Sequence, residues 1–205
     1  RKNLKAYSLM KVVGITGGIA SGKSTISSYL QNKHKAYIFD ADKEAKLLLN
    51  SKLISEKIYK AFPKLLDLSK TSIANEAFKN QESQRKINNI IHPVISDLIL
   101  ERINDKKTSH TLFVIDAALI IESGIFNKHR ENGSKLILVT AEKDLRLQRA
   151  LERSNLSEQT INNRMKLQMN DSQKIKYADY IIKNNSTKSE LYNRVDEIIK
   201  KIIHE

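Results

Sequence analysis

The chain has 205 residues, of which 40% are hydrophobic and 29% are charged, and it carries a net charge of +13. This length suits one buried domain with a sizeable insertion, and no apolar run approaches the roughly 18 residues that cross a bilayer. The chain contains no cysteine, which excludes disulfides and thiolate metal sites and favours a reducing cytoplasm. The lysines are scattered, so the positive charge fits a plain surface as well as it fits a polyanionic partner.

Residues 1–9 are predicted to be an extension, and their basic start is not followed by the apolar segment of a secretory signal. A short apolar strand is predicted at residues 12–16, and residues 17–24 then match the pattern G-x-x-x-x-G-K-[ST] without a gap. Residues 23–30 lack Gly and Pro and show helical spacing. Strand, glycine-rich loop and helix in this order predict a nucleotide-binding site. A glycine-rich turn without a ligand is the weaker alternative.

The residue types of this loop have a chemical reason. Its glycines let successive backbone N–H groups point into one concavity, which the positive N-terminus of the following helix reinforces. Lys23 is expected to reach the β- and γ-phosphates, and the Ser24 hydroxyl to take one position on Mg²⁺. The residues expected to contact the nucleotide are Gly18, Ile19, Ala20, Ser21, Gly22, Lys23, Ser24 and Thr25.

Two carboxylates follow the second predicted strand, which covers residues 36–39 and is succeeded by Asp40 and Asp42. In a parallel sheet the carboxyl ends of the strands face the ligand, so both should lie near the phosphate-binding loop. The alternative is that one of them only caps the helix that begins near Lys43, because Asp is favoured at that position.

Residues 51–108 contain no convincing strand and are predicted to form a helical insertion that covers the substrate. Helical spacing stops at His92-Pro93 and resumes after it, which indicates two helices with a boundary there. On sequence alone, His92 fits a residue at this helix boundary as well as it fits a substrate contact.

A third strand is predicted at residues 111–115 and ends in Asp116, a pattern typical of a carboxylate that contacts Mg²⁺ through water or orients Ser24. After a fourth strand, a helix carries Arg149 and Arg153, which are four residues apart and therefore share one face. We expect these two arginines to converge on the transferring phosphates, and the alternative is a solvated basic face.

The polar residues 154–172 have the size of a lid, and a last strand and helix follow at residues 180–182 and 189–203. The alternation of strands and helices predicts an α/β fold like that of P-loop NTPases, with a parallel five-stranded sheet and helices on both faces. The nucleotide-binding core is predicted to comprise residues 10–50, 109–153 and 173–205.

With these features in place, the chain resembles the dephospho-coenzyme A kinase family from Met10 to the last helix. Many families share the phosphate-binding loop, whereas Asp40-Ala41-Asp42, His92-Pro93 and the ending from Ala178-Asp179 to Asn184-Asn185 are more specific. The resemblance implies transfer of the ATP γ-phosphate to the ribose 3′-hydroxyl of dephospho-coenzyme A, with Asp42 facing that hydroxyl and Asn185 in the adenine pocket. The substrate-binding residues that it implies are Asp40, Asp42, Lys70, His92 and Glu122.

The chain departs from the family pattern at several positions. Ala20 stands where the family often has Gly, a change that is harmless where the backbone φ is negative. Ala118 replaces a usual Pro, and Arg146 a usual Gln. Lys70 is the candidate to stand in for a family Arg, but a lysine lacks the bidentate fork that an arginine offers to a phosphate.

A nucleoside or nucleoside-monophosphate kinase is the alternative enzyme, since it would share the loop and the lid. A GTPase is disfavoured because the chain lacks an Asn-Lys-x-Asp motif, and an ATP-gated nucleic-acid-binding module would rest on the net charge alone. We therefore expect ATP and dephospho-coenzyme A as partners, neither nucleic acid nor membrane, and a cytoplasmic monomer or small homo-oligomer.

Overall fold

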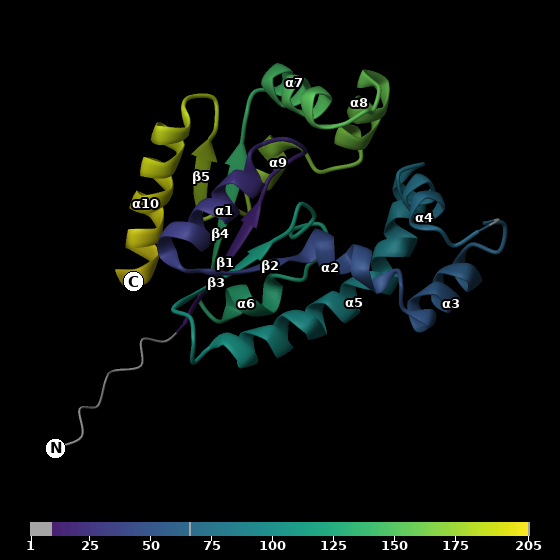
Figure 1. Cartoon of the computed structure of the whole chain (residues 1–205), viewed down its shortest axis with the longest axis horizontal. Coiled ribbons are helices and arrows are strands. Elements are labelled where there is room, and N and C mark those ends of the chain that lie inside the picture. Colours follow the sequence, from purple (N-terminus) through teal and green to yellow (C-terminus); the bar gives the residue numbers. More distant parts are fainter. Residues whose placement is uncertain (1–9, 66, 205) are drawn as a thin grey trace.

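A parallel sheet of five strands forms the centre of the molecule, with the strand order β2-β3-β1-β4-β5 (Figure 1). The computed structural model describes residues 10–65 and 67–204, so the predicted extension at residues 1–9 lies outside the described residues. All four strand pairings are parallel, as the sequence predicts. The strands are β1 Lys11–Thr16, β2 Tyr37–Asp40, β3 Leu112–Asp116, β4 Lys135–Thr140 and β5 Tyr180–Lys183.

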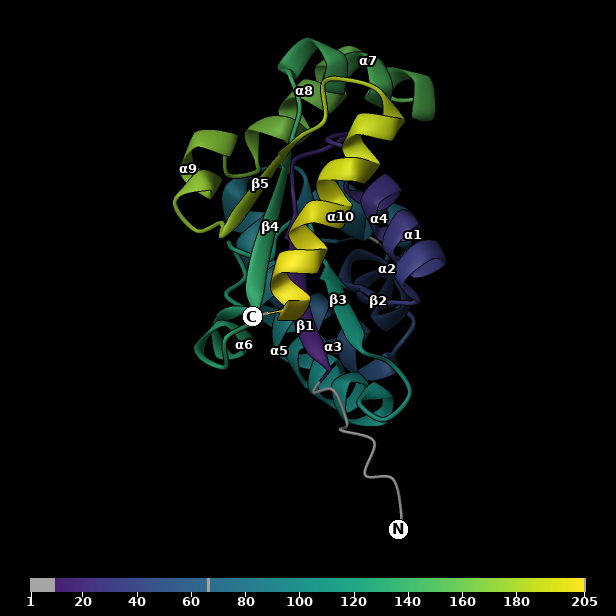
Figure 2. The same ribbon diagram turned by 90° about the vertical axis from the view of Figure 1, so that its left-hand side faces the viewer.

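Helices cover both faces of the sheet, with α1 and α10 on one face and α5 and α6 on the other (Figures 1 and 2). Of the described helices, none is both long and apolar enough to span a membrane. The helices are α1 Lys23–His34, α2 Ala41–Leu48, α3 Lys52–Ala61, α4 Lys70–Ala77, α5 Gln81–Lys106, α6 Asn127–Glu131, α7 Lys143–Arg153, α8 Glu158–Lys166, α9 Asp171–Ile175 and α10 Lys188–His204.

The central strands are apolar on both sides because both sides are covered. In β3, Leu112 and Val114 pack in the hydrophobic cluster with α1 and α10, whereas Phe113 and Ile115 pack in the cluster with α5. All five residues of β3 are buried. A continuous apolar run is therefore what this position in a doubly covered sheet requires, and such a run is recognisable in the sequence.

Helix α5 continues through Pro93, so the predicted boundary at His92-Pro93 is wrong. A proline inside a helix removes one backbone hydrogen bond and costs about 3 kcal/mol. The cost is tolerated because the buried stripe of α5 runs on at intervals of four residues on both sides of the proline. This stripe consists of Ile87, Ile91, Ile95 and Ile99.

The helices of the insertion (residues 51–108) belong to the same hydrophobic cluster as one face of the sheet. Ile58 of α3 and Ile73 of α4 join this cluster together with Phe113 of β3. Helices α3 and α4 project from the sheet, and α5 runs back along it (Figure 1). The insertion is thus anchored to the sheet through α5.

The predicted lid (residues 154–172) packs on the phosphate-binding loop through a much smaller apolar cluster. Ile161 of α8 is buried there against Ala20 of the loop and Ala150 of α7. Ile19, Leu147, Leu156 and Met165 flank this contact and are only partly buried.

Candidate active site

The phosphate-binding loop joins β1 to α1 with two residues in the left-handed backbone region. Gly22, just before α1, has a φ of 100°, which suits glycine. Ala20 has a φ of 58°, so the exchange of the family's Gly for Ala is not neutral here and costs about 1–2 kcal/mol of backbone energy. The Ala20 methyl group lies in the contact with the lid.

Lys23, the first residue of α1, faces two carboxylates. Its Nζ atom donates a hydrogen bond to Asp116 Oδ1 and lies 3.8 Å from Asp42 Oδ2. Burial lowers the pKa of Lys23, but the carboxylates of Asp116, Asp42 and Asp40 outweigh burial and the pKa lies above its ordinary value. Lys23 is therefore held as a cation at the carboxyl ends of β2 and β3.

Asp116 ends β3 and is buried, with its carboxylate bound on both oxygens. Oδ1 accepts from Lys23, and Oδ2 accepts from the Ser27 hydroxyl at 2.6 Å. The hydrogen bond expected from Ser24 is thus made by Ser27, one turn further along α1. Ser27 faces the sheet and is buried, whereas Ser24 is exposed, and the loop motif does not distinguish the two.

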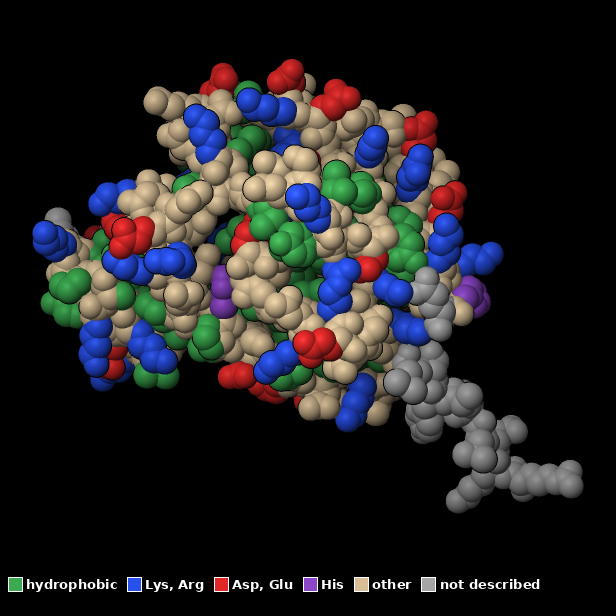
Figure 3. Space-filling model, turned by 180° about the vertical axis from the view of Figure 1, so that it is seen from behind, with side chains coloured by type: hydrophobic (Ala, Val, Ile, Leu, Met, Phe, Trp, Pro, Cys, Tyr) green, Lys and Arg blue, Asp and Glu red, His purple; other side chains and the backbone are tan. Residues whose placement is uncertain are grey.

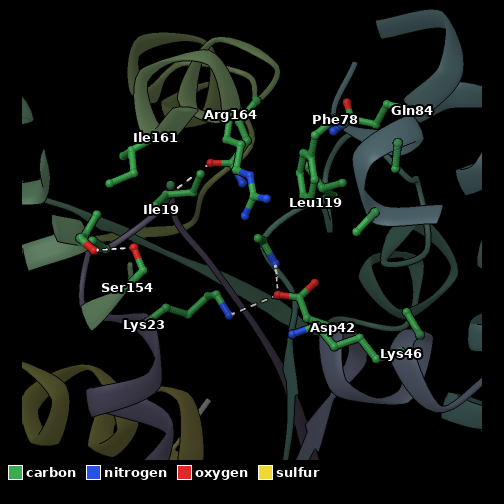
Figure 4. A pocket seen from close by; sticks show the side chains of 18 of the residues that line it. Ile19, Lys23, Asp42, Lys46, Phe78, Gln84, Leu119, Ser154, Ile161 and Arg164 are labelled. Atoms are coloured by element: carbon green, nitrogen blue, oxygen red, sulfur yellow. Dashed lines mark hydrogen bonds and ion pairs between the residues drawn. The ribbon is translucent and has the colours of Figure 1, made fainter. Parts of the chain in front are cut away.

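The two carboxylates after β2 divide into a helix cap and a cavity residue. Asp40 caps α2 by accepting from the backbone N–H of Lys43 at 2.9 Å, as one of the sequence alternatives had it. Asp42 lies in the first turn of α2 and points toward Lys23 (Figure 4). Its Oδ2 atom also lies 3.4 Å from the backbone N of Ala118, which donates a weak hydrogen bond.

The environment of Asp42 raises the pKa of its carboxyl group. Burial between the walls of the cavity is the largest cause, and nearby Asp116 and Asp40 add to it, whereas Lys23 and the Ala118 N–H oppose it. The side chain is still 49% exposed, so a ligand in the cavity can reach it. An accessible carboxylate with a raised pKa is suited to accept a proton.

The cavity in front of Lys23 and Asp42 has a volume of about 580 Å³. The phosphate-binding loop, helices α2, α4 and α5, the segment after β3 and the lid surround it (Figure 4). Away from the loop its walls are largely apolar. The lining residues include Ala45, Leu49, Ile73, Ala77, Phe78, Ile87, Ile91, Leu119 and Leu156.

The two predicted arginines of α7 do not converge. Arg153 lines the cavity, but the Arg149 guanidinium donates to the backbone carbonyl of Asn184 at 3.1 Å. The second cavity-lining arginine is Arg164 of α8, which the sequence analysis missed because nothing in its spacing separates it from other polar lid residues. Arg164 stacks over Phe78, 4.4 Å from the ring centroid (Figure 4).

Both backbone polar groups of Ile19 in the loop are hydrogen-bonded to side chains of α7 and of residues 154–172. Arg146 donates to the Ile19 carbonyl at 2.9 Å, and the Gln168 side chain accepts from the Ile19 N–H at 3.1 Å. A Cβ atom at Gly18 would lie 2.1 Å from the Arg146 guanidinium, so Gly18 leaves room for this contact. Arg146 is therefore part of the site in place of the usual Gln.

Asn184 and Asn185, which follow β5, make contacts with different parts of the protein. The Asn184 side chain donates to the Ser21 carbonyl of the loop at 2.8 Å, a contact that the sequence analysis missed. Asn185, the predicted adenine contact, instead exchanges two hydrogen bonds of 2.9 and 3.0 Å with Glu142. Asn185 thus fixes the start of α7 and does not line the cavity described above.

The remaining predicted substrate contacts lie outside this cavity. Lys70 is exposed at the start of α4 and lines neither the 580 Å³ cavity nor a second cavity of about 900 Å³. His92 and Glu122 line this second cavity, and burial lowers the pKa of His92 while Glu122 opposes the shift.

Glu122 is engaged within the protein. It accepts from the Met169 backbone N–H and lies 3.1 Å from Lys174 Nζ. Lys174 is fully buried, and its pKa is lowered by burial, which Glu122 opposes.

The donors near Lys23 fit Mg²⁺ in type. Within residues 10–65 and 67–204 there is no group of three or more His, Cys, Asp or Glu side chains that holds a metal by itself. Mg²⁺ usually binds through one or two protein oxygens together with waters and substrate phosphates. The exposed Ser24 hydroxyl and the carboxylate of Asp116 are such oxygens.

Comparison with known proteins agrees with this geometry. A family model described as dephospho-CoA kinase matches residues 11–190. The dephospho-CoA kinase of Fusobacterium nucleatum is 34% identical over 196 residues, covering 93% of this chain and 98% of the relative. That of Aquifex aeolicus is 34% identical over 203 residues, covering 94% and 98%.

Solved structures agree as well. The dephospho-CoA kinase from Campylobacter jejuni has a TM-score of 0.63 at 30% identity and covers 94% of this chain and 97% of its own. A shikimate kinase from Acinetobacter baumannii, at 16% identity and a TM-score of 0.60 over 98% and 97% of the two chains, shows the same kinase fold. The chain belongs to the dephospho-CoA kinase family, whose members phosphorylate dephospho-CoA to CoA.

Proposed function

We propose that the transfer takes place in the 580 Å³ cavity, from the γ-phosphate of ATP to the ribose 3′-hydroxyl of dephospho-CoA. One observation carries this assignment. Lys23 of the phosphate-binding loop and Asp42 of α2 face each other across 3.8 Å, so a phosphate bound by the first group lies beside the second. A hydroxyl held at Asp42 is then close to the phosphoryl group that it attacks.

Lys23 would neutralise the charge that develops between the β- and γ-phosphates. Its raised pKa keeps it charged throughout the physiological range. The loop N–H groups and the N-terminus of α1 supply further donors to the phosphates. Among the described residues, the buried atoms Ser21 Oγ and Arg164 Nε have no hydrogen-bond partner, which fits a ligand that brings acceptors.

Asp42 would orient the acceptor hydroxyl and receive its proton. The raised pKa makes the carboxylate a better base than an ordinary aspartate. A loose transition state in phosphoryl transfer demands little of the base, so correct placement of the hydroxyl is the larger part of this role.

Ser24 and Asp116 would hold Mg²⁺ together with the ATP phosphates. When bound, the ion screens the negative charge of the phosphates. Asp116 is already bound to Lys23 and Ser27, so its contact with the ion runs through water.

Arg153 and Arg164 would complete the site from the side of α7 and the lid. Both line the cavity, and a guanidinium matches the geometry of a phosphoryl group. With α8 packed on the loop, the lid also keeps water from the transferring group.

An acceptor screen tests this proposal. ADP release from ATP is measured with dephospho-CoA as acceptor and, separately, with each member of a panel of nucleosides and nucleoside monophosphates. Each acceptor is tested in the presence of Mg²⁺ and again after a chelator has removed it. We expect efficient turnover only with dephospho-CoA and Mg²⁺. Equal turnover with nucleoside monophosphates would support the alternative kinase, and full turnover without Mg²⁺ would contradict the assignment of Ser24 and Asp116.

We also propose a cytoplasmic monomer or small homo-oligomer without a nucleic-acid partner. The absence of cysteine and the scattered lysines support this. RNA binding that persists at moderate salt would contradict it, since surface charge alone gives binding that salt removes.

A further inference from the structure

We propose that Ala118, two residues after the end of β3, is a positioning residue that orients the Asp42 carboxylate for the acceptor hydroxyl. This inference rests on the proposed function, in which Asp42 holds that hydroxyl. The backbone N–H of Ala118, and not its methyl group, carries the role. The family usually has a proline here, and a proline has no N–H, so the contact is a feature of this chain and not of the usual family pattern.

The Asp42 side chain has little else to fix its direction. It is 49% exposed in its cavity, and Figure 3 shows the surface hollowed between the projecting insertion and the rest of the molecule. Lys23 Nζ lies 3.8 Å away, beyond hydrogen-bond distance, and donates to Asp116 instead. Within residues 10–65 and 67–204, the N–H of Ala118 is therefore the only group that donates a hydrogen bond to the Asp42 carboxylate.

The two oxygens of the Asp42 carboxylate have different surroundings. Oδ2 faces both Lys23 Nζ and the Ala118 N–H. Oδ1 has no hydrogen bond or ion pair with any residue that the structure describes, so it is left to accept from the acceptor hydroxyl. The terminal torsion of an aspartate turns easily, because its energy wells are broad. A donor on Oδ2 restricts this rotation and thereby sets the direction in which Oδ1 accepts.

Ala118 is itself held firmly, so its N–H has a fixed direction. Just before it, the Ala117 N–H donates to the Ile15 carbonyl at 3.1 Å, which continues the pairing of β3 with β1. The Ala118 carbonyl accepts from the hydroxyl of Thr16 in β1 and from Lys174 of α9. Thr16 and Lys174 are both fully buried. The donor to Asp42 is thus fixed to the edge of the sheet, whereas the carboxylate that it orients lies on α2.

The length of the contact sets the size of the expected effect. At 3.4 Å, the distance from the Ala118 N atom to Asp42 Oδ2 is long for a hydrogen bond. Catalytic hydrogen bonds are often long before substrates bind and shorten in the reacting complex. One hydrogen bond of ordinary net strength corresponds to about a fivefold change in rate. The contact therefore adjusts the rate of a reaction that Lys23 and Asp42 make possible.

An exchange of one amide for an ester tests this role. Lactic acid incorporated in place of Ala118 in the full chain removes the N–H and keeps the methyl group, whereas Ala118→Pro also adds a ring to the cavity wall. The matched control is the same exchange at Ala178, whose N–H donates to the Ile175 carbonyl at 3.2 Å and which lines neither cavity. We would measure the rate of phosphoryl transfer in a single turnover, and KM for both substrates by steady-state kinetics.

We expect the Ala118 ester to slow phosphoryl transfer about fivefold, with both KM values changed less than twofold. The Ala178 ester should react like wild type. In an Asp42→Ala background the Ala118 ester should cause no further loss, because the carboxylate that the N–H orients is gone. An unchanged rate for the Ala118 ester, or the same loss in both backgrounds, would overturn the positioning role.

The Asp42→Ala variant alone separates this inference from the proposed function. Full turnover of that variant would overturn the role of Asp42, and the role of Ala118 with it. A large loss in Asp42→Ala, combined with an Ala118 ester that reacts like wild type, would overturn only the role of Ala118.

Discussion

Lys174 is fully buried, and its Nζ atom donates a hydrogen bond of 2.8 Å to the backbone carbonyl oxygen of Ala118. The same carbonyl accepts from the Thr16 hydroxyl at 3.1 Å, and the N–H of Ala118 faces Asp42. A buried cation on α9 thus holds Ala118, the residue whose N–H contacts the proposed base. Glu122 supplies the counter-charge that makes the burial of Lys174 tolerable.

Removing this cation alone should destabilise the fold. Lys174→Met leaves Glu122 without its partner, and breaking a buried ion pair in this way costs about 3–5 kcal/mol. The double variant Lys174→Met/Glu122→Gln removes both charges and should recover much of the loss. Urea denaturation gives the free energies of unfolding, with the exposed Lys200→Met as control. A Lys174→Met variant as stable as wild type would contradict the role of the pair.

The pH dependence of turnover should report on Asp42. Because the pKa of Asp42 lies above its ordinary 3.8, kcat/KM should fall as the pH decreases through that raised pKa. Asp42→Asn should remove this acid limb and lower kcat by roughly 10²- to 10⁴-fold, the range for a general base. Near-normal turnover of the variant would rule out the role of Asp42 as base.

The stability of the same variant separates this role from that of a helix cap. A raised pKa in the folded state means that the stability contributed by Asp42 is present at low pH and is lost as the pH rises above 3.8 through the raised pKa. Asp42→Asn should therefore melt at the same or a higher temperature than wild type at pH 7. Asp40→Ala is the comparison, because loss of the α2 cap should cost about 1 kcal/mol.

Gly22 and Gly133 both have a positive φ, so replacing each by alanine separates the cost of backbone strain from the cost of a steric clash. Gly22 and Gly133 have φ values of 100° and 82°. A Cβ atom at Gly22 would lie 2.0 Å from Asn184 Nδ2, whereas one at Gly133 meets no described atom within 4 Å. Gly133→Ala should cost about 1–2 kcal/mol of stability and leave ATP binding intact. Gly22→Ala should cost more and weaken ATP binding at least tenfold by calorimetry, and equal effects of the two changes would contradict the packing of Asn184 on the loop.

Arg149 and Arg153 of α7 should respond differently to replacement by lysine. Arg153 lines the cavity, so Arg153→Lys keeps the charge, loses the fork and should lower kcat about tenfold or more. Arg149 binds the Asn184 carbonyl, so Arg149→Lys should act mainly on KM for ATP and on the melting temperature. Steady-state kinetics and thermal denaturation of both variants check this prediction. Identical losses of kcat would contradict it and would indicate that both arginines act on the transferring phosphates.

The order of strands and helices and the phosphate-binding loop could be predicted because their signals are local. Residues 12–16 and 111–115 are short apolar runs. The observed β1 begins one residue earlier than predicted, and the observed β3 is shifted by one residue toward the C-terminus. The loop motif needs no partner elsewhere in the chain for its recognition. The position of Asp42 beside the loop could be predicted for a similar reason, since its place after a strand follows from the order of the elements.

What the sequence could not provide depends on contacts between distant parts of the chain. The choice of Ser27 over Ser24 as the partner of Asp116 depends on which face of α1 packs on the sheet. Asn184 and Ser21 are 163 residues apart in the chain, and the local sequence around either residue does not predict their hydrogen bond. The continuous α5 shows that the packing of a helix face outweighs the local penalty of Pro93.

The difference in size between the two apolar contacts has a consequence for motion. The insertion shares its hydrophobic cluster with the sheet, so moving it as a body means exposing the side chains that stabilise the whole domain. Among the residues that the structure describes, the cluster that attaches the lid to the loop has Ala20, Ala150 and Ile161 at its centre, so opening of the lid would expose little apolar surface. We therefore propose that the insertion stays fixed during the catalytic cycle, and that the lid opens to admit ATP and to release ADP. On this proposal, the rate of lid opening would set an upper limit on turnover.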